Sequence, residues 1–152
     1  MKYVEAPEEH LGGGRSLFLA GGISGCREWQ REFAQLLRDT SLVVLNPRRR
    51  SFPMDDPSAA EAQIGWEFRH HSLASAASFW FPPETLCPIA LYELGRWSAG
   101  ARPLYVGTDR DYRRRVDVQV QMKLARPAVR VVQSLNELAA QVIAATRRES
   151  CS

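Results

Sequence analysis

Cysteine is scarce in this sequence and occurs in no pattern that indicates a metal site or a disulfide. The three cysteines, Cys26, Cys87 and Cys151, lie far apart, and their number is odd. No CxxC pair or cluster of cysteine and histidine accompanies them, so neither a disulfide framework nor a structural zinc site is supported. Free thiols are typical of a reducing compartment, and we therefore expect a cytoplasmic protein.

Long apolar runs are also absent. No run reaches the roughly 18 residues that a transmembrane helix needs, and residues 1–16 lack the apolar core of a signal peptide. We expect no association with a membrane.

The net charge is small. Twenty basic and 17 acidic residues give a formal charge of +3, which by itself does not indicate a nucleic-acid partner. Arginine runs at 48–50 and 113–115 are suited to a phosphate or a polyanion, but a solvated surface explains most such runs. No RNA-binding aromatic motif or helix-turn-helix signature accompanies them, so nucleic acid is not expected.

The remaining composition is that of one globular domain. The chain has 152 residues, of which 45% are hydrophobic and 24% charged, which suits a single core. Residues 1–14 end in three consecutive glycines and are expected to form a flexible lead-in. We place the domain at residues 15–148 and a short tail at 149–152.

Short apolar runs alternate with helical patterns along this domain. The runs predict buried strands at 15–20, 42–45, 77–81, 104–106 and 129–132, and the helical spacings predict helices at 26–38, 59–74, 85–99, 111–124 and 134–146. Ser134 and Glu137 form a capping box at the last helix. Strands that are apolar on both faces indicate a parallel sheet covered by helices on both sides.

The expected fold is therefore α/β: a flavodoxin-like (Rossmann-like), doubly wound, five-stranded parallel sheet in three αβα layers. Such sheets bind ligands at the carboxyl ends of their strands, near the point where the strand order reverses. A glycine turn, Gly21 to Gly25, follows the first expected strand and would let a ligand approach the backbone. The alternative is a plain strand-to-helix turn.

Glu93 has the most unusual expected surroundings. In the segment PIALYELG, helical spacing places Ile89 and Trp97 on its face, one turn before and after it. A carboxylate among apolar neighbours loses solvation, and such a costly placement is typical of functional sites. The alternative is a solvated helix glutamate, or one paired with Arg96.

A second acid, Glu67, lies in QIGWEFRHH just before the third expected strand. Two carboxyl groups near one another suit glycosidic chemistry, in which one attacks the anomeric carbon and the other manages the proton of the leaving group. The alternative is an exposed glutamate or an ion pair. His70 and His71 point about 100° apart on a helix, so both cannot reach one site, and we interpret a histidine here as structural.

Five blocks in this order resemble the nucleoside 2-deoxyribosyltransferase-like family: LFLAGGISG, LNPRRRSFP, QIGWE, FWFPPETLCPIALYELG and RVDVQVQ, over about residues 15 to 124. The resemblance implies a flavodoxin-like fold and a glutamate nucleophile, Glu93 of Tyr92-Glu93-Leu94-Gly95. It implies that Glu67 matches the family's second acid, usually an aspartate, with one methylene more. The other substrate-binding positions that it implies are Gly21, Gly22, Asn46, Arg48, Phe52 and Tyr92.

The resemblance also implies a reaction. Glu93 would displace the base from a nucleoside, and a second base or water would then attack the glycosyl-enzyme, with no metal or redox cofactor. The alternatives are an N-glycoside hydrolase acting on a nucleoside, a nucleotide or NAD, and a domain that senses a nucleotide without turnover. The partner is a small nucleoside or nucleotide, and the resemblance together with the aromatic residues Trp66 and Phe68 indicates a homo-oligomer.

Overall fold

The structure, a computed structural model, describes residues 1–53 and 55–150. The strands are β1 (Lys2–Glu5), β2 (Ser16–Gly21), β3 (Val43–Asn46), β4 (Ala76–Phe81), β5 (Leu104–Thr108) and β6 (Val131–Val132). The helices are α1 (Trp29–Leu36), α2 (Pro57–Leu73), α3 (Pro88–Ser98), α4 (Arg115–Ala125) and α5 (Leu135–Ser150). The expected tail, 149–152, overlaps the end of α5, and Cys151 lies outside the described residues.

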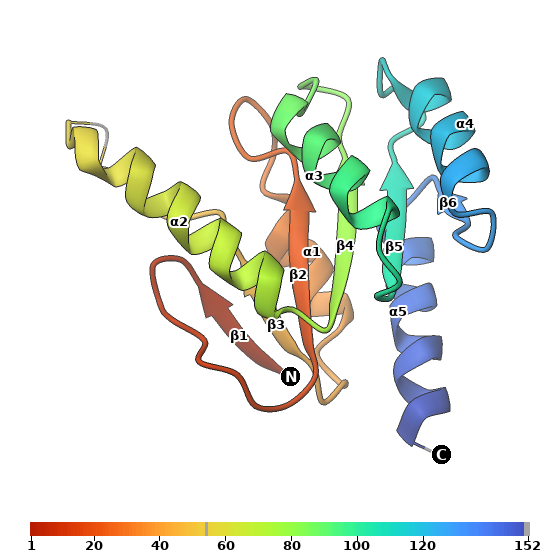
Figure 1. Ribbon diagram of the computed structural model, residues 1–152, viewed down its shortest axis with the longest axis horizontal. Coiled ribbons are helices and arrows are strands. Elements are labelled where there is room, and N and C mark those ends of the chain that lie inside the picture. Colours follow the sequence, from red (N-terminus) through yellow and green to blue (C-terminus); the bar gives the residue numbers. More distant parts are fainter. Residues whose placement is uncertain (54, 151–152) are drawn as a thin grey trace.

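All strand pairs are parallel, in the order β1-β3-β2-β4-β5-β6, and helices flank the sheet (Figure 1). The α/β class with a parallel sheet is thus confirmed, but the expected number of strands is wrong, because the sheet has six. The additional strand, β1, lies within residues 1–14. It pairs with β3 from Lys2 beside Val43 to Glu5 beside Asn46. That partner lies about forty positions away in the sequence, so no local pattern reveals the pairing.

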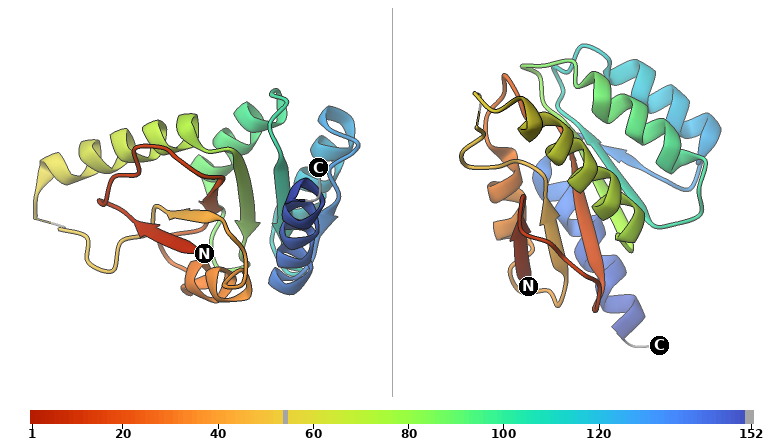
Figure 2. Two further views of the ribbon diagram at one scale, coloured as in Figure 1. Left: turned by 90° about the horizontal axis from the view of Figure 1, so that it is seen from below. Right: turned by 60° about the vertical axis from the view of Figure 1, so that its left-hand side comes forward.

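The sheet has helices on both faces (Figure 2) and separates two hydrophobic cores. One core joins α2, α3 and α4 to one face of the strands, and the other joins α1 and α5 to the opposite face. Neighbouring residues of β2 alternate between them, as a strand period of two requires: Phe18 belongs to the first core, and Leu17 and Leu19 to the second. This arrangement has the three layers that the alternating pattern predicts.

The helices begin and end where the sequence supplies capping groups. Asp56 accepts a hydrogen bond from the Ser58 amide at 2.9 Å before α2, and Pro57 occupies the first helical position. At α5, the Glu137 amide donates to Ser134 Oγ at 3.2 Å, and the Glu137 carboxylate accepts from the Gln133 amide at 3.1 Å. The Ser134 half of the expected capping box is therefore present, whereas the Glu137 carboxylate binds the amide one residue before the cap. None of the helices in the described part of the chain is both long and apolar enough to span a membrane.

The strand order reverses between β2 and β4. From β2 the chain crosses through α1 to β3 on one side, whereas β4 continues through α3 to β5 on the other side. The two connections cover opposite faces of the sheet, so they leave a crevice at the carboxyl ends of β2 and β4. Gly21 ends β2 there, directly beside Trp80 of β4.

Gly21 is required by this close approach. Its φ of 147° is rarely adopted by residues with a side chain, and a Cβ at this position would collide with the carbonyl oxygen of Trp80. Gly22 follows under a similar constraint, because an added Cβ would come within 2.6 Å of Pro82 Cγ. The Gly22 carbonyl accepts hydrogen bonds from Trp29 Nε1 and Gln30 Nε2, both at 2.8 Å, which fix the turn.

Replacement of Gly21 by alanine is expected to lower the free energy of unfolding by about 2 kcal/mol or more, since it adds both backbone strain and a clash with backbone. Gly95→Ala is the matched control. Gly95 lies in α3 with nothing within 4 Å of an added Cβ, so alanine there should stabilise the protein by about 0.5–1 kcal/mol. Urea unfolding of both variants measures the difference, and equal stabilities would contradict the constraint at Gly21.

Candidate active site

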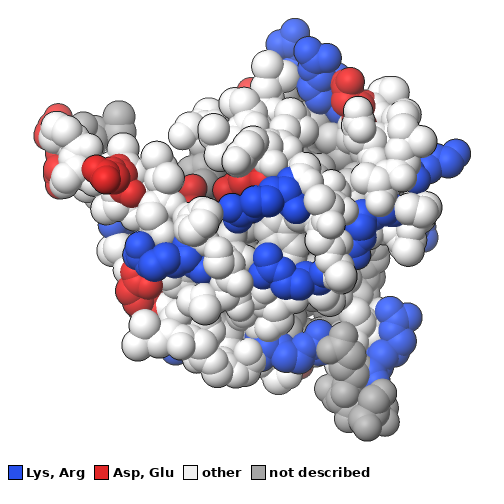
Figure 3. All heavy atoms as spheres, in the orientation of Figure 1, with Lys and Arg blue, Asp and Glu red and all other residues white. Residues whose placement is uncertain are grey.

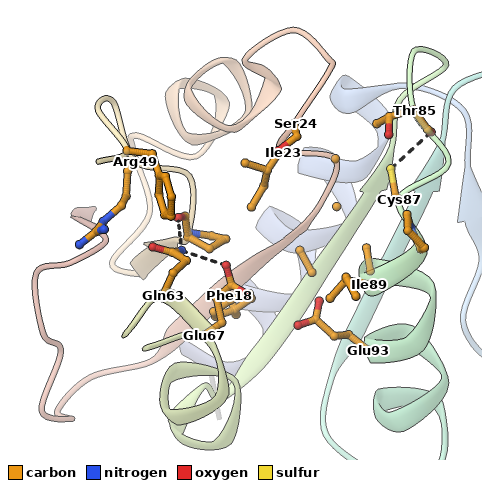
Figure 4. A pocket seen from close by; sticks show the side chains of 17 residues that line it. Phe18, Ile23, Ser24, Arg49, Gln63, Glu67, Thr85, Cys87, Ile89 and Glu93 are labelled. Carbon is orange, nitrogen blue, oxygen red and sulfur yellow. Dashed lines mark hydrogen bonds between the residues drawn. The ribbon is translucent and has the colours of Figure 1, made fainter. Parts of the chain in front are cut away.

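A cavity of about 450 Å³ opens at the reversal of strand order (Figure 4). It lies among the end of β2, the loop after β3, helix α2, and the segment from β4 into α3. The residues that line it are Phe18, Ala20, Gly21, Gly22, Ile23, Ser24, Pro47, Arg49, Phe52, Gln63, Glu67, Thr85, Cys87, Pro88, Ile89, Ala90 and Glu93. Both acids singled out from the sequence therefore face the same space.

Glu93 enters the cavity from α3. Ala90, Leu94 and Trp97 of this helix are buried against the sheet, which leaves Glu93 at the edge of the core with a side chain 16% exposed. Arg96, its alternative partner in the sequence analysis, instead lies over the Phe68 ring at 5.3 Å. Glu93 is thus neither a solvated helix glutamate nor the partner of that arginine.

His71 lies behind Glu93. Its Nε2 is 3.1 Å from Glu93 Oε1, and its ring is 1% exposed and stacks on Phe18 with the centroids 3.8 Å apart. On the other side of the ring, Trp97 Nε1 donates to Nδ1 at 2.9 Å. The sequence analysis interpreted this histidine as structural, and no local signal reveals the contact, because α2 and α3 meet only in the folded chain.

Glu67 enters from α2, on the opposite wall (Figure 4). Gln63 Nε2, one turn earlier, donates to Glu67 Oε1 at 2.9 Å and to the Pro47 carbonyl at 2.7 Å. Burial raises the pKa of Glu67, the hydrogen bond from Gln63 opposes this shift, and the charge of Glu93 adds to it. A carboxyl group that holds its proton to a higher pH than usual is suited to act as an acid.

The other positions implied by the family resemblance divide into two groups. Gly21, Gly22 and Phe52 line the cavity, whereas Asn46, Arg48 and Tyr92 do not. Tyr92 is 74% exposed. Asn46 is fully buried at the end of β3: its Nδ2 donates to Tyr3 Oη at 2.6 Å, and its Oδ1 accepts from the Arg48 amide at 3.0 Å. Asn46 therefore closes the turn after β3.

Arg48 joins the loops that follow β2 and β3. Its guanidinium donates to the carbonyl groups of Arg27 at 2.8 Å and Cys26 at 3.0 Å, and it reaches Gln30 Oε1 at 3.4 Å. The neighbouring Arg49 lines the cavity instead and approaches the Phe52 ring at 5.8 Å. The basic loop thus supplies one arginine to the scaffold and the next one to the cavity.

The thiols of Cys87 and Cys26 have raised pKa values. Burial raises the pKa of Cys87, which lines the cavity, to about 12, and it also raises the pKa of Cys26. Both thiols are therefore protonated near neutral pH and are poor nucleophiles. Among residues 1–53 and 55–150, no group of three or more His, Cys, Asp or Glu side chains is placed to hold a metal ion.

Basic side chains are spread over the face that Figure 3 shows, with uncharged residues between them. Several basic residues of the domain have local partners that explain their positions. Arg69 pairs with Glu9 at 2.6 Å, and Arg102 donates to the carbonyl groups of His71 and Ala74 at 3.0 and 2.8 Å. These arginines serve the packing of the domain.

The cost of burying Glu67 predicts a pH-dependent change in stability. Because the pKa of Glu67 is raised in the folded state, its ionised form disfavours folding once the pH exceeds that pKa. Glu67→Gln is expected to raise the free energy of unfolding by on the order of 1 kcal/mol at about pH 8. The gain should vanish as the pH falls below the ordinary value of 4.5, where the carboxyl group is protonated in both states.

Urea unfolding of both proteins across this pH range measures the effect. The matched control is Glu61→Gln on the same helix, where the side chain is exposed and the substitution should change little at either pH. A Glu67→Gln protein that is less stable than the parent near pH 8 would show that donors in the cavity compensate the charge.

Comparison with known proteins supports the resemblance seen in the sequence. The model of a family described as "Nucleoside 2-deoxyribosyltransferase like" matches residues 14–112. This range runs from just before β2 to beyond β5 and includes every residue that lines the cavity. No curated protein matches the chain. The match covers well over half of the 152 residues, and the chain belongs to the nucleoside 2-deoxyribosyltransferase-like family.

Proposed function

We propose that the protein cleaves or exchanges the N-glycosidic bond of a nucleoside-type substrate through a covalent glycosyl-Glu93 intermediate. The observation that carries this proposal is the convergence of Glu67 and Glu93 on one cavity from two different helices. Their environments differ: burial raises the pKa of Glu67, whereas Glu93 Oε1 lies 3.1 Å from the ring nitrogen Nε2 of His71. Two carboxyl groups held in different surroundings suit an acid and a nucleophile.

The reaction has two displacement steps. In the first, a carboxylate oxygen of Glu93 bonds to C1′ while the bond from C1′ to the base nitrogen breaks, and its electron pair stays on the base. The Glu67 carboxyl donates its proton to the base. In the second, an acceptor base or water attacks C1′, the Glu93 carboxylate leaves, and the proton of the acceptor passes to Glu67.

The walls of the cavity suit a base on one side and a sugar on the other. Phe52 supplies an aromatic face to the cavity that Glu67 and Gln63 also line, and stacking on such a face tolerates different bases. Gln63 Oε1 is buried and has no hydrogen-bond partner among the described residues, so it is available to an N–H group of a base. Gly21 and Gly22 let the substrate approach the backbone at the end of β2.

A hydrolase and a sensor are the two alternatives. In a hydrolase, water takes the place of the acceptor base, and the substrate is a nucleoside, a nucleotide or NAD. In a sensor, the cavity binds such a molecule without turnover. A panel of these compounds, incubated with and without a second free base and separated by chromatography, distinguishes the three. A new nucleoside indicates transfer, free base alone indicates hydrolysis, and binding without change indicates a sensor.

Glu93→Gln is expected to reduce turnover by on the order of 10³-fold or more, because an amide retains the shape of the side chain but does not attack C1′. Glu93→Ala should be equally inactive. A 2-fluoro-2-deoxy nucleoside that the protein accepts should leave a glycosyl adduct on the peptide containing Tyr92 to Gly95, detected by mass spectrometry. Glu61→Gln, an exposed glutamate outside the cavity, is the matched control. Near-normal turnover by Glu93→Gln on a confirmed substrate would reject the mechanism.

We also propose that the protein forms homo-oligomers. Of the two aromatic residues that suggested this, Trp66 is 2% exposed within the core, but Phe68 is 60% exposed. Helix α4 adds an exposed apolar stripe of Val116, Val120 and Leu124 at intervals of four residues. Sedimentation velocity should show an assembly that Val120→Glu weakens. A monomer at high micromolar concentration would contradict the proposal.

A further inference from the structure

Two adjacent histidines of α2 are fully buried and have opposite hydrogen-bond partners. His70 Nε2 accepts from the His10 amide at 3.0 Å, and its Nδ1 lies 2.8 Å from the Trp66 carbonyl. His70 must therefore carry its proton on Nδ1. His71 is the reverse, because Trp97 Nε1 is only a donor and occupies Nδ1 at 2.9 Å. The proton of His71 is therefore on Nε2, the atom that lies 3.1 Å from Glu93 Oε1.

His71 is held in this neutral form by its surroundings. A proton added to Nδ1 would meet the indole N–H of Trp97, and the imidazole ring lies among Phe18, Phe79 and Trp97. The charged groups that face this cluster are Glu93 and Arg102, whose guanidinium lies 3.9 Å from the Trp97 ring centroid. The guanidinium packs on the Trp97 ring, whose N–H group donates to His71 Nδ1.

We propose that His71 is a positioning residue for the Glu93 nucleophile: its Nε2–H group binds Oε1 and leaves Oε2 to attack the anomeric carbon. The inference rests on the proposed function and adds an assignment of the two carboxylate oxygens. The Nε2–H bond points off the line to Oε1 in the structure, so the contact lies within ion-pair distance without full alignment. Rotation of the carboxylate about its last bond, which is a soft torsion, aligns the two groups.

The contact between His71 Nε2 and Glu93 Oε1 has a different consequence in each of the two displacement steps. When Oε2 bonds to C1′ and the base leaves with its electron pair, Oε1 becomes the carbonyl oxygen of the glycosyl ester, still beside the His71 N–H group. When the acceptor attacks C1′, the bond from Oε2 to C1′ breaks and its electron pair returns to the carboxylate. The N–H group stabilises the charge that then develops on Oε1. A neutral donor does this without pairing the nucleophile to a full positive charge.

The state of His71 is tested first by ¹⁵N NMR of the full chain labelled on histidine, which requires no substrate. His71 should show a protonated Nε2 and an unprotonated Nδ1, and His70 the opposite tautomer. The spectra of His70→Gln and His71→Gln assign the signals. Trp97→Phe should release the restraint on Nδ1. An Nδ1-protonated His71 would overturn the inference.

The second test is kinetic and uses whichever nucleoside the chromatographic panel identifies. His71→Phe should lower kcat about 10- to 100-fold with little change in KM, the range expected for the loss of one hydrogen bond to a charged group. His71→Gln, whose amide supplies an N–H group, should recover part of the loss. His70→Gln is the matched control, and its kcat should stay within about twofold of the parent.

These outcomes separate the inference from the proposed function. If Glu93→Gln is inactive but His71→Phe keeps the parental kcat, the positioning role is wrong and the nucleophile stands. If His70→Gln and His71→Phe lose activity equally, His71 is structural. If the panel contains no substrate, the proposed reaction is wrong for those compounds. The NMR arm then still decides whether His71 presents its N–H group to Glu93, since Glu93→Gln should shift the His71 Nε2 signal.

Discussion

The close parallel contact between the ends of β2 and β4 is the constraint on which the site depends. Gly21 lies beside Trp80 at an approach that no side chain at position 21 would permit. Because the chain leaves these two strands toward opposite faces of the sheet, the crevice between them is open at this point. The glycine turn therefore has a structural and a functional reason at once: it lets the strands pair to their ends, and it leaves backbone exposed at the floor of the cavity.

The second level of organisation is the burial of polar groups against one hydrophobic core. Phe18, Trp97 and the aromatic residues around them surround His71, so this ring depends on the Trp97 N–H group and the Glu93 carboxylate for its polar contacts. A buried polar group without partners costs free energy, and the hydrogen bond from Trp97 Nε1 to His71 Nδ1 reduces this cost. The same aromatic residues that stabilise the fold therefore also place the His71 ring beside Glu93.

The sequence predicted the central strands well, because each is an apolar run closed by glycine, proline or asparagine. It failed at β1, where KYVE has one fully buried apolar residue, Val4, and a partner strand far along the chain. In the site, the sequence singled out Glu67 and Glu93, the family resemblance favoured them over solvated or ion-paired glutamates, and the fold brings both to one cavity. The contacts of His71 with Trp97 and Glu93 were not predicted, because they form between two helices. Local periodicity reports which face a residue occupies and not what that face meets.

Arg48 shows that the sequence pattern can also predict a ligand contact where the fold has a structural one. Its place in a basic loop at a strand end fitted a ligand contact equally well, and only the fold shows that it binds the carbonyl groups of Arg27 and Cys26. The role of Arg48 in this loop also affects Glu67 of α2. Arg48 and Asn46 fix the turn that carries Pro47, and the Pro47 carbonyl shares the Gln63 amide with Glu67. The loop after β3 and Glu67 are therefore connected through the side-chain amide of Gln63. Glu67 is a longer side chain than the aspartate of the family pattern, and Gln63 restrains this additional reach.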